Sequence, residues 1–195
     1  MKFTIITVCL NSENTIKYTL NSILEQSHKD LEHIIIDGGS TDNTTHILKN
    51  YPFKNKKVIL KKKAGIYESI NIGIKKAKGD VIAILHSNDI FQSPETISNI
   101  NNYFSKTNEN ILLTNIVFFK DDQFKQITRY YTAKNFQPWM LRFGLMPPHT
   151  GAFIKKKIYN ENGLYDEKFK IAGDFDLFLR FFLIKKKKYK FINIT

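Results

Sequence analysis

The chain has 195 residues, with 30 Lys and Arg against 18 Asp and Glu, a formal net charge of +12 with neutral histidines. Its 42% hydrophobic and 13% aromatic content excludes a disordered polycation and predicts one folded domain with a substantial core. The single cysteine, Cys9, excludes a disulfide framework and a cysteine-rich metal site, so we expect a reducing, cytoplasmic setting. The apolar run of residues 3–10 is too short to span a bilayer, and no signal-peptide cleavage site follows it, so we expect neither membrane spanning nor secretion.

The positive charge leaves three classes of anionic partner open: nucleic acid, phosphate-bearing molecules and anionic lipid. Only Arg129, Arg142 and Arg180 among the basic residues are arginine, the side chain that makes most bidentate contacts with bases and phosphates. We therefore expect no nucleic-acid partner. Most lysines are expected to form a solvated surface, and a minority are available to anionic lipid or phosphate.

Apolar runs and helix-spaced apolar residues alternate along the first part of the chain, which predicts alternating strands and helices. The expected strands are 2–10, 31–37, 58–60 and 81–85. The expected helices are 16–26, the stretch from a cap at 40–42 to residue 50, 66–77 and 94–105.

The remaining third has a less regular pattern. We expect a strand at 111–119, a turn at Asp121-Asp122 and a strand at 124–131 that pairs back as a hairpin. An amphipathic helix over 174–184, a lysine run and a final strand at 189–194 complete the prediction. The repeated strand-helix order predicts the α/β class, with a Rossmann-like, mostly parallel sheet flanked by helices in one domain.

Polar residues follow three of the expected strands: Asn11 after the first, residues 37–42 after the second and 86–89 after the fourth. In open α/β sheets, ligands bind beyond the carboxyl ends of the strands, so these residues are expected to meet at one edge. Each piece alone is more often a turn, a helix cap or an ordinary loop. Together they indicate a binding site.

Acidic side chains at such an edge indicate nucleoside-diphosphate binding. One carboxylate can accept a hydrogen bond from a base or ribose, and a second can hold Mg²⁺ or Mn²⁺ against the diphosphate. The chain has neither a G-x-G-x-x-G after its first strand nor a G-x-x-x-x-G-K-[ST] motif. Both absences argue against a dinucleotide dehydrogenase and a P-loop NTPase.

Blocks of sequence along nearly the whole chain resemble, in order, the family 2 glycosyltransferases, which have the GT-A fold. The blocks are 5–11, 22–27, 32–44, 65–74, 77–80, 85–89, 148–153, 163–169 and 172–180. The resemblance is to the bacterial branch that builds capsule, O-antigen or exopolysaccharide units. It implies a GT-A glycosyltransferase domain over 1–195 that inverts configuration and uses a nucleotide sugar, normally a UDP-sugar.

The resemblance also implies which residues form the nucleotide-sugar site. Thr7 and Cys9 would border the base, and Asp37 would accept a hydrogen bond from it. Asn71 would approach the ribose and diphosphate. Residues 86–89 take the place of the family's Asp-x-Asp metal motif.

This sequence departs from the metal motif, because His86 and Asn88 stand where the family has acidic residues. Asp89 is therefore the residue expected to bind Mg²⁺ or Mn²⁺, with Asn88 as a weaker, neutral contact. For His149 two interpretations stay open: a contact with phosphate, metal or acceptor, or a structural role. The substitutions also keep an alternative function open, a catalytically weak or inactive subunit that binds nucleotide.

Asp174 matches the family's catalytic base, which deprotonates the acceptor hydroxyl. A carboxylate near a helix N-terminus is favoured in its ionised form and can accept such a proton, although a simple N-cap is the alternative. By resemblance, the acceptor is a saccharide or a polyprenyl-diphosphate-linked saccharide at the inner face of the membrane.

A cationic protein would be drawn to the anionic membrane surface as a peripheral partner. The amphipathic stretches 135–143 and 175–184 have two possible fates, docking there or core packing. At the C-terminus, which follows soon after the base motif, an incomplete acceptor side and a truncated chain both stay open.

Overall fold

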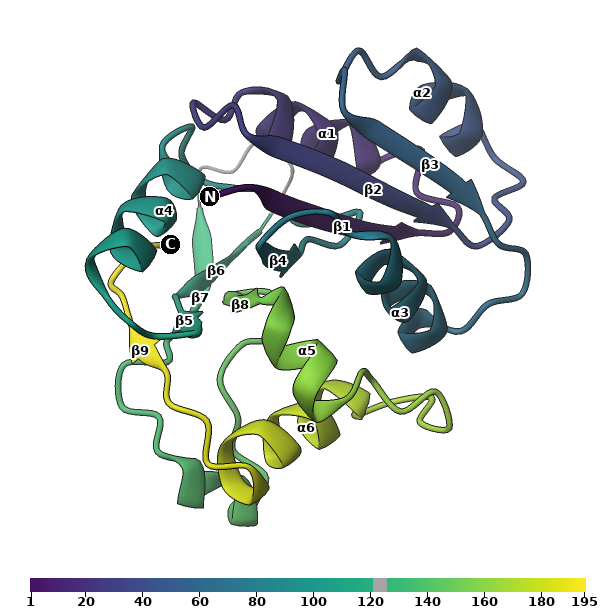
Figure 1. Ribbon diagram of the computed structural model, residues 1–195. Coiled ribbons are helices and arrows are strands. Elements are labelled where there is room, and N and C mark those ends of the chain that lie inside the picture. The colour runs from purple at the N-terminus through teal and green to yellow at the C-terminus, as the bar shows by residue number, and fades with distance from the viewer. Residues whose placement is uncertain (121–125) are drawn as a thin grey trace.

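The computed structural model describes residues 1–120 and 126–195. Its centre is a seven-stranded sheet in the order β3-β2-β1-β4-β8-β5-β9, accompanied by a two-stranded hairpin (Figure 1). The strands of the sheet are β1 (Phe3–Cys9), β2 (Leu31–Asp37), β3 (Lys56–Leu60), β4 (Val81–Ile84), β5 (Ile111–Leu113), β8 (Ala152–Lys155) and β9 (Lys190–Phe191). The hairpin consists of β6 (Ile116–Phe119) and β7 (Ile127–Tyr131).

Helices cover both faces of the sheet, with α1 and α2 on one side and α3 on the other (Figure 1). Ile16 and Leu20 of α1 pack with Cys9 on the first face, whereas Ile70 and Ile74 of α3 belong to the cluster on the second. The α-helices are α1 (Ile16–Leu24), α2 (Thr44–Asn50), α3 (Ile66–Lys76), α4 (Thr96–Lys106), α5 (Lys156–Asn162) and α6 (Gly173–Phe178). A 3-10 helix, η1 (Pro138–Phe143), and a π-helical segment, η2 (Leu179–Ile184), follow β7 and α6 respectively.

The strand directions place the carboxyl ends of the parallel strands at one edge of the sheet, as expected. β1 pairs in parallel with β2 and β4, and β2 pairs in parallel with β3, so these strands all end on the same side. β8 runs antiparallel to both β4 and β5, and β9 is parallel to β5. The expected α/β fold with a mostly parallel sheet flanked by helices is therefore confirmed.

The prediction of one strand over 111–119 is wrong. The chain leaves the sheet at Thr114 and Asn115, whose backbone N–H groups donate to Gly151 O and Ile194 O, at 2.8 Å each. The apolar run then continues as β6, which pairs with β7 as the expected hairpin. The predicted turn at Asp121-Asp122 lies outside the described residues. Thr114 and Asn115 are the only polar residues in this run, and two polar residues between apolar segments are also compatible with a single strand.

The less regular third contains two elements that the pattern did not predict, β8 and α5, and a short helix, η1, within the amphipathic stretch 135–143. β8 is only four residues long and its first three residues are buried, so it lacks the alternation of a half-exposed strand. The helix expected over 174–184 begins as α6 and widens into the π-helical η2. The final strand is shorter than expected and consists of Lys190 and Phe191.

A buried carboxylate ties the amino ends of the central strands together. Glu32 Oε1 accepts hydrogen bonds from Thr4 Oγ1 at 2.5 Å, from Gly79 N at 3.0 Å and from the backbone N–H of Lys78. A Cβ on Gly79 would lie 2.6 Å from Thr4 Oγ1, so only glycine permits this approach. These contacts fix β1 and β2 to the turn between α3 and β4.

Within residues 1–120 and 126–195, no helix has the length and apolar character needed to cross a bilayer.

The buried His33 of β2 makes folding sensitive to pH. Its Nε2 lies 2.9 Å from Thr7 Oγ1 and its Nδ1 lies 3.4 Å from the Tyr51 hydroxyl, and burial lowers its pKa from 6.5 to about 3. In the unfolded chain this histidine is protonated below about pH 6.5, whereas in the folded chain it is protonated only below about pH 3. Stability should therefore fall with decreasing pH, with this residue contributing about 1 kcal/mol per pH unit.

We expect His33→Gln to remove this contribution to the pH dependence of the free energy of unfolding, measured by urea unfolding between pH 7.5 and 4.5. The exposed substitution His46→Gln is the matched control for the exchange itself. Parallel pH profiles for wild type and His33→Gln would contradict the assignment.

Candidate active site

The loops that follow β1, β2 and β4 are joined by hydrogen bonds at the carboxyl edge of the sheet. Asn11 Oδ1 accepts a hydrogen bond from Thr41 N at 2.9 Å, and Asn11 N donates to Ser40 Oγ at 2.9 Å. The hydroxyls of Ser12 and Ser87 are 2.9 Å apart. The three polar segments singled out in the sequence therefore meet in space.

Asp37 lies at the end of β2 and is almost completely buried. Its Oδ1 accepts hydrogen bonds from Gly39 N (3.1 Å), Ser40 N (2.9 Å) and Ser40 Oγ (2.7 Å), and its Oδ2 accepts one from Thr45 Oγ1 (3.2 Å). The carboxylate thus shapes the loop in which Gly39 has a φ of +102°. Among the described residues, Oδ2 accepts only the hydrogen bond from Thr45 Oγ1 and keeps a second acceptor site. A contact between Asp37 and the base stays a prediction.

Thr7 and Cys9 are fixed inside the sheet. Thr7 has no exposed surface and its hydroxyl is bonded to His33, while the Cys9 thiol donates to Ile36 O at 3.7 Å. Burial, with the nearby Asp37 carboxylate, raises the pKa of Cys9 to about 12, so the thiol stays protonated and unreactive at neutral pH. The expected border with a base would have to form through backbone, because these side chains face the interior.

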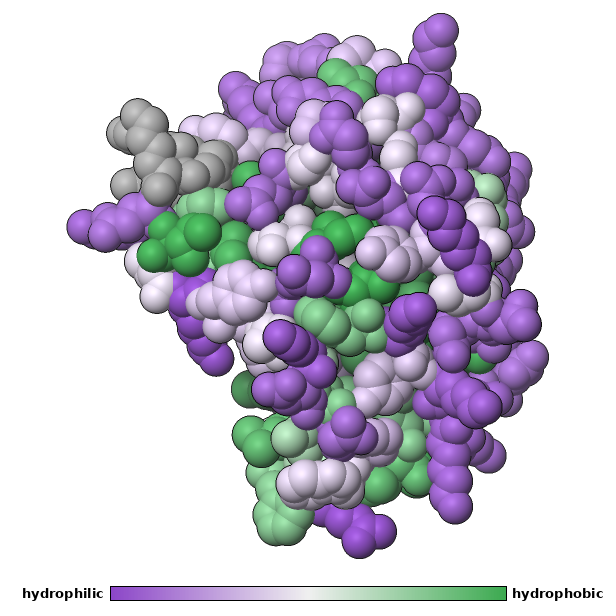
Figure 2. All heavy atoms as spheres, turned by 90° about the vertical axis from the view of Figure 1, so that its left-hand side faces the viewer, coloured by the Kyte–Doolittle hydropathy of each residue, from purple (hydrophilic) through white to green (hydrophobic). Residues whose placement is uncertain are grey.

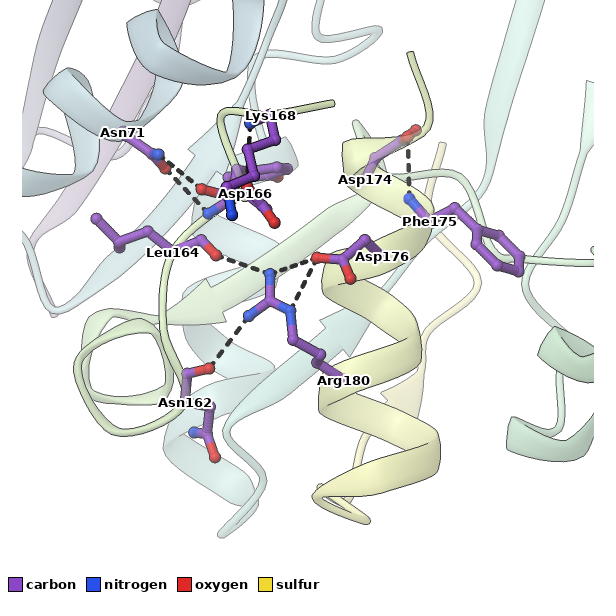
Figure 3. Close-up of polar contacts among 10 residues, drawn as sticks. Asn71, Asn162, Leu164, Asp166, Lys168, Asp174, Phe175, Asp176 and Arg180 are labelled. Carbon is purple, nitrogen blue, oxygen red and sulfur yellow. Dashed lines mark hydrogen bonds and ion pairs between the residues drawn. The ribbon is translucent and has the colours of Figure 1, made fainter. Parts of the chain in front are cut away.

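Asn71 joins α3 to the loop before α6. Its Nδ2 donates to Tyr165 O at 2.8 Å and its Oδ1 accepts from Tyr165 N at 3.0 Å (Figure 3). Its Nδ2 also donates to Glu167 Oε1 at 2.9 Å. The residue is buried. Asn71 therefore positions the loop, and its predicted approach to a ribose or diphosphate would be indirect.

The loop after β4 presents Asn88 and Asp89. Asp89 Oδ2 accepts a hydrogen bond from His86 N at 3.2 Å, whereas the Asn88 side chain is exposed. Burial raises the pKa of Asp89, an effect opposed by His86. Among the described residues there is no cluster of three or more metal-ligating His, Cys, Asp or Glu side chains. One carboxylate fits a divalent cation that takes its other ligands from a substrate diphosphate and water, which is the usual manner of Mg²⁺ binding.

Asp174 is held by side chains from two other elements. Its Oδ1 accepts a hydrogen bond from the Tyr67 hydroxyl of α3 at 3.3 Å and from Phe175 N at 3.0 Å, the latter drawn in Figure 3. Its Oδ2 lies 3.2 Å from Nδ1 of His149, the residue three positions before β8. The N-cap of α6 is Ala172, in a left-handed conformation, so the alternative of a simple cap at Asp174 is wrong.

His149 links Asp174 to the loop after β4, because its Nε2 lies 3.1 Å from Nε2 of His86. Burial and the neighbouring His86 lower the pKa of His149 to about 4, despite the opposing charge of Asp174, so the ring is neutral at neutral pH. A neutral ring can donate from one nitrogen only. We assign that proton to Nδ1, facing Asp174, which leaves Nε2 to accept from His86; both contacts are then satisfied.

Arg180 holds the surroundings of Asp174 in place. Its guanidinium donates to Asp176 Oδ2 at 2.8 Å, to Asn162 O at 3.2 Å and to Leu164 O at 2.7 Å (Figure 3). These bonds fasten α6 to the end of α5 and to the following loop. Supporting roles for Arg180 and Tyr67 were not predicted from the sequence. The Asp176–Arg180 spacing of four residues was an available signal, since such pairs meet on one helix face.

A cavity of about 380 Å³ adjoins this site on the side of the β6-β7 hairpin. Its lining combines the loop after β4 with the hairpin and the start of β8, and includes Asn88, Asp89, Phe91, Val117 and Gly151. The cavity therefore opens beside Asp89, the residue expected from the sequence to bind a cation.

Close packing between α3 and α6 yields a stability prediction. A Cβ on Gly173 would lie 2.7–2.9 Å from the ring of Tyr67, which stacks on Tyr165 with 5.6 Å between centroids. We expect Gly173→Ala to lower the free energy of unfolding by about 1–3 kcal/mol through overpacking. Gly65→Ala is the matched control, because nothing lies within 4 Å of its added Cβ. Equal effects of the two substitutions in denaturant unfolding would contradict this packing.

Curated proteins similar to this chain are glycosyltransferases. The "PGL/p-HBAD biosynthesis glycosyltransferase" of Mycobacterium bovis (strain BCG / Pasteur 1173P2) is 24% identical over 183 residues, which cover 92% of this chain and 69% of the relative. An uncharacterised glycosyltransferase of Mycobacterium tuberculosis is 28% identical over 185 residues, covering 92% of this chain and 68% of the relative.

Solved structures share the fold. TarS 1-349 of S. aureus in complex with UDP-GlcNAc superimposes with a TM-score of 0.74 at 24% identity, covering 92% of this chain and 53% of that one. The mannosyltransferase PcManGT from Pyrobaculum calidifontis, in complex with GDP-Man and Mn²⁺, gives a TM-score of 0.72 at 14% identity, covering 98% and 55%. The chain thus spans about half the length of these structures. The GT-A fold expected from the sequence is confirmed.

The family model described as "Glycosyl transferase family 2" matches residues 4–172, which is most of the chain. The strand-end loops and the Asp89 loop lie inside this match, and Asp174 lies two residues beyond it. The chain belongs to glycosyltransferase family 2.

Proposed function

We propose that this chain transfers a sugar, with inversion of configuration, from a nucleotide sugar to a hydroxyl of an acceptor saccharide, using Asp174 as the general base. The observation that carries the proposal is the placement of the Asp174 carboxylate, fixed by Tyr67 and His149 beside the Asp89 loop. The side chain of Asp174 keeps 21% of its surface exposed, which leaves room for an incoming hydroxyl.

The hydrogen bonds to Asp174 suit this task. Each carboxylate oxygen has two acceptor sites, and Asp174 Oδ2 uses only one of them, in its contact with His149. Tyr67 and His149 orient the carboxylate without giving it a proton, because burial raises the pKa of Tyr67 and the assigned His149 ring is neutral. A hydroxyl within about 3 Å of the free lone pair is then in reach for proton transfer.

The reaction follows from this placement. Asp174 takes the proton of the acceptor hydroxyl as its oxygen bonds to the anomeric carbon from the face opposite the diphosphate. The bond between that carbon and the diphosphate oxygen breaks, and its electron pair leaves with the nucleoside diphosphate. Asp174 ends protonated and is later deprotonated by solvent.

The donor is proposed to be a UDP-sugar bound across the ends of β1, β2 and β4, with Asn88, Asp89 and His149 near its diphosphate and sugar. The likeness to TarS, which was solved with UDP-GlcNAc, supports the nucleotide-sugar class. Asp89, which fits a cation shared with a diphosphate, would hold Mg²⁺ or Mn²⁺. Such an ion neutralises charge on the leaving diphosphate when bound.

The acceptor is proposed to be a saccharide or a polyprenyl-diphosphate-linked saccharide in bacterial cell-surface polysaccharide synthesis, at the cytoplasmic face of the membrane. The net charge of +12 supports peripheral attraction to anionic lipid. His86 and Asn88 in the metal loop favour one alternative, a subunit that binds nucleotide without transfer, and the first experiment below separates the two.

The base assignment is tested with UDP release measured over a panel of UDP-sugars and acceptors. Asp174→Asn preserves shape and removes the base, so transfer should fall by about 10²- to 10⁴-fold, while calorimetric affinity for UDP changes little. Asp166→Asn, an exposed change in the preceding loop, is the matched control and should retain activity. Transfer that survives in Asp174→Asn would contradict the role of Asp174. UDP binding with no transfer by the wild type across the panel would favour the inactive subunit.

The metal role of Asp89 has its own test. We expect a chelator to abolish transfer and Mn²⁺ to restore it. Asp89→Asn should raise the Mn²⁺ concentration for half-maximal activity on the order of tenfold or more. Asp80→Asn, at the opposite end of β4, is the matched control. Full activity in chelator, or an unchanged Mn²⁺ requirement in Asp89→Asn, would show that Asp89 holds no cation.

A further inference from the structure

Three large apolar side chains of one short segment are exposed at one end of the molecule. Trp139, Phe143 and Leu145 are 55%, 73% and 58% exposed, although Phe136 and Leu141 beside them are buried. The rings of Trp139 and Phe143 contact each other edge to face, with centroids 6.0 Å apart. One face of η1 therefore completes the core, and the other presents a compact apolar surface that nothing in the described residues covers.

The chain around the C-terminal lysine run is joined to the same segment through Phe182 and Tyr189. The Tyr189 hydroxyl donates to Phe136 O at 2.6 Å, and the ring of Phe136 contacts those of Phe182 and Tyr189, with centroids 5.5 Å and 5.4 Å apart. η1 is thereby joined to η2 and to residues 185–190 at the lower end of Figure 1. Figure 2 shows hydrophobic and hydrophilic residues side by side at that end.

The charge of these two segments has one sign. Residues 134–145 contain Lys134 and Arg142, residues 184–190 contain five lysines, and neither contains an acidic residue. Lys187 pairs with Glu161 at 3.4 Å, and within the described chain no other cation of the two segments forms an ion pair. A surface that joins exposed aromatic rings to unpaired cations matches the interface of an anionic bilayer, where rings sit at headgroup depth and cations meet phosphate.

We propose that η1, Leu145 and the lysines of 185–190 form a docking surface for an anionic lipid bilayer. The chain continues from Leu145 through Met146 to His149, and the Tyr131 hydroxyl contacts Met146 O, so the surface is directly joined to the catalytic edge. A membrane-embedded acceptor would reach Asp174 from this side. This last step rests on the proposed function, whereas lipid docking itself does not.

A second basic surface provides the comparison. The lysines around β3 flank the exposed Val58 and Leu60 on the edge strand of the sheet. Lysines on an edge strand are a common protection against pairing with other chains, and this surface carries no aromatic side chain in β3. The η1 surface is therefore the one suited to a bilayer.

The test uses the full chain and its only tryptophan, Trp139, as the reporter. Vesicles of phosphatidylcholine with 30% phosphatidylglycerol are compared with vesicles of phosphatidylcholine alone. We expect sedimentation with the anionic vesicles only, a blue shift of Trp139 emission, quenching by brominated acyl chains, and release at 0.5 M salt. No nucleotide sugar is present, so the outcome is separate from that of the transfer assays.

Variants locate the contact. Phe143→Ser with Leu145→Ser should weaken vesicle binding at least tenfold, and the matched pair Val58→Ser with Leu60→Ser should leave it unchanged. Lys185→Gln, Lys186→Gln and Lys188→Gln together should remove the preference for anionic vesicles, and this surface change keeps the test available if the apolar pair fails to fold. The proposal would be overturned if the protein did not bind the vesicles, or if it bound them without a change in Trp139 emission. It would also be overturned if the Val58 and Leu60 substitutions abolished binding, or if self-association without lipid shifted Trp139 emission.

Discussion

The hydrogen bonds to the Asp174 carboxylate join parts of the chain that are far apart in sequence. Tyr67 reaches it from α3, and His149 reaches it from the segment before β8. Gly173 allows the Tyr67 ring to approach, and Arg180 fixes α6 against the preceding loop. A carboxylate held from both sides has a defined direction, and preorganisation of this kind is what general-base catalysis requires.

The parallel half of the sheet and the antiparallel β8 contribute different parts of the proposed site. β1, β2 and β4 end at one edge and bring together the loops proposed to bind the nucleotide. β8 enters next to β4 in the opposite direction, so its amino end, preceded by His149, lies at the same edge. The His86–His149 contact is the point at which the two parts meet.

Much of the fold was predictable from the sequence, because buried parallel strands and amphipathic helices have clear patterns. The strand at 31–37 and the helix beginning at Ile66 are examples. β8 escaped prediction because a strand of four residues, three of them buried, carries no periodicity. The break at Thr114 escaped because both flanking strands are apolar. The acidic candidates were found by type and position, but the sequence does not show that Asp37 accepts hydrogen bonds from its own loop or that Asn71 bonds to the loop before α6. The Asn71 bond is a tertiary contact across 94 positions, whereas the Asp37 bonds are local and depend on the conformation of the loop after β2.

The central claim is that the nucleotide sugar binds at the carboxyl edge of β1, β2 and β4, within reach of Asp174. A crystal structure of the chain with Mn²⁺ and a non-hydrolysable UDP-sugar analogue tests it most directly. The account predicts the diphosphate beside Asp89 and the anomeric carbon facing Asp174, with space between them for one hydroxyl. A nucleotide bound elsewhere, or an anomeric carbon turned away from Asp174, would contradict it.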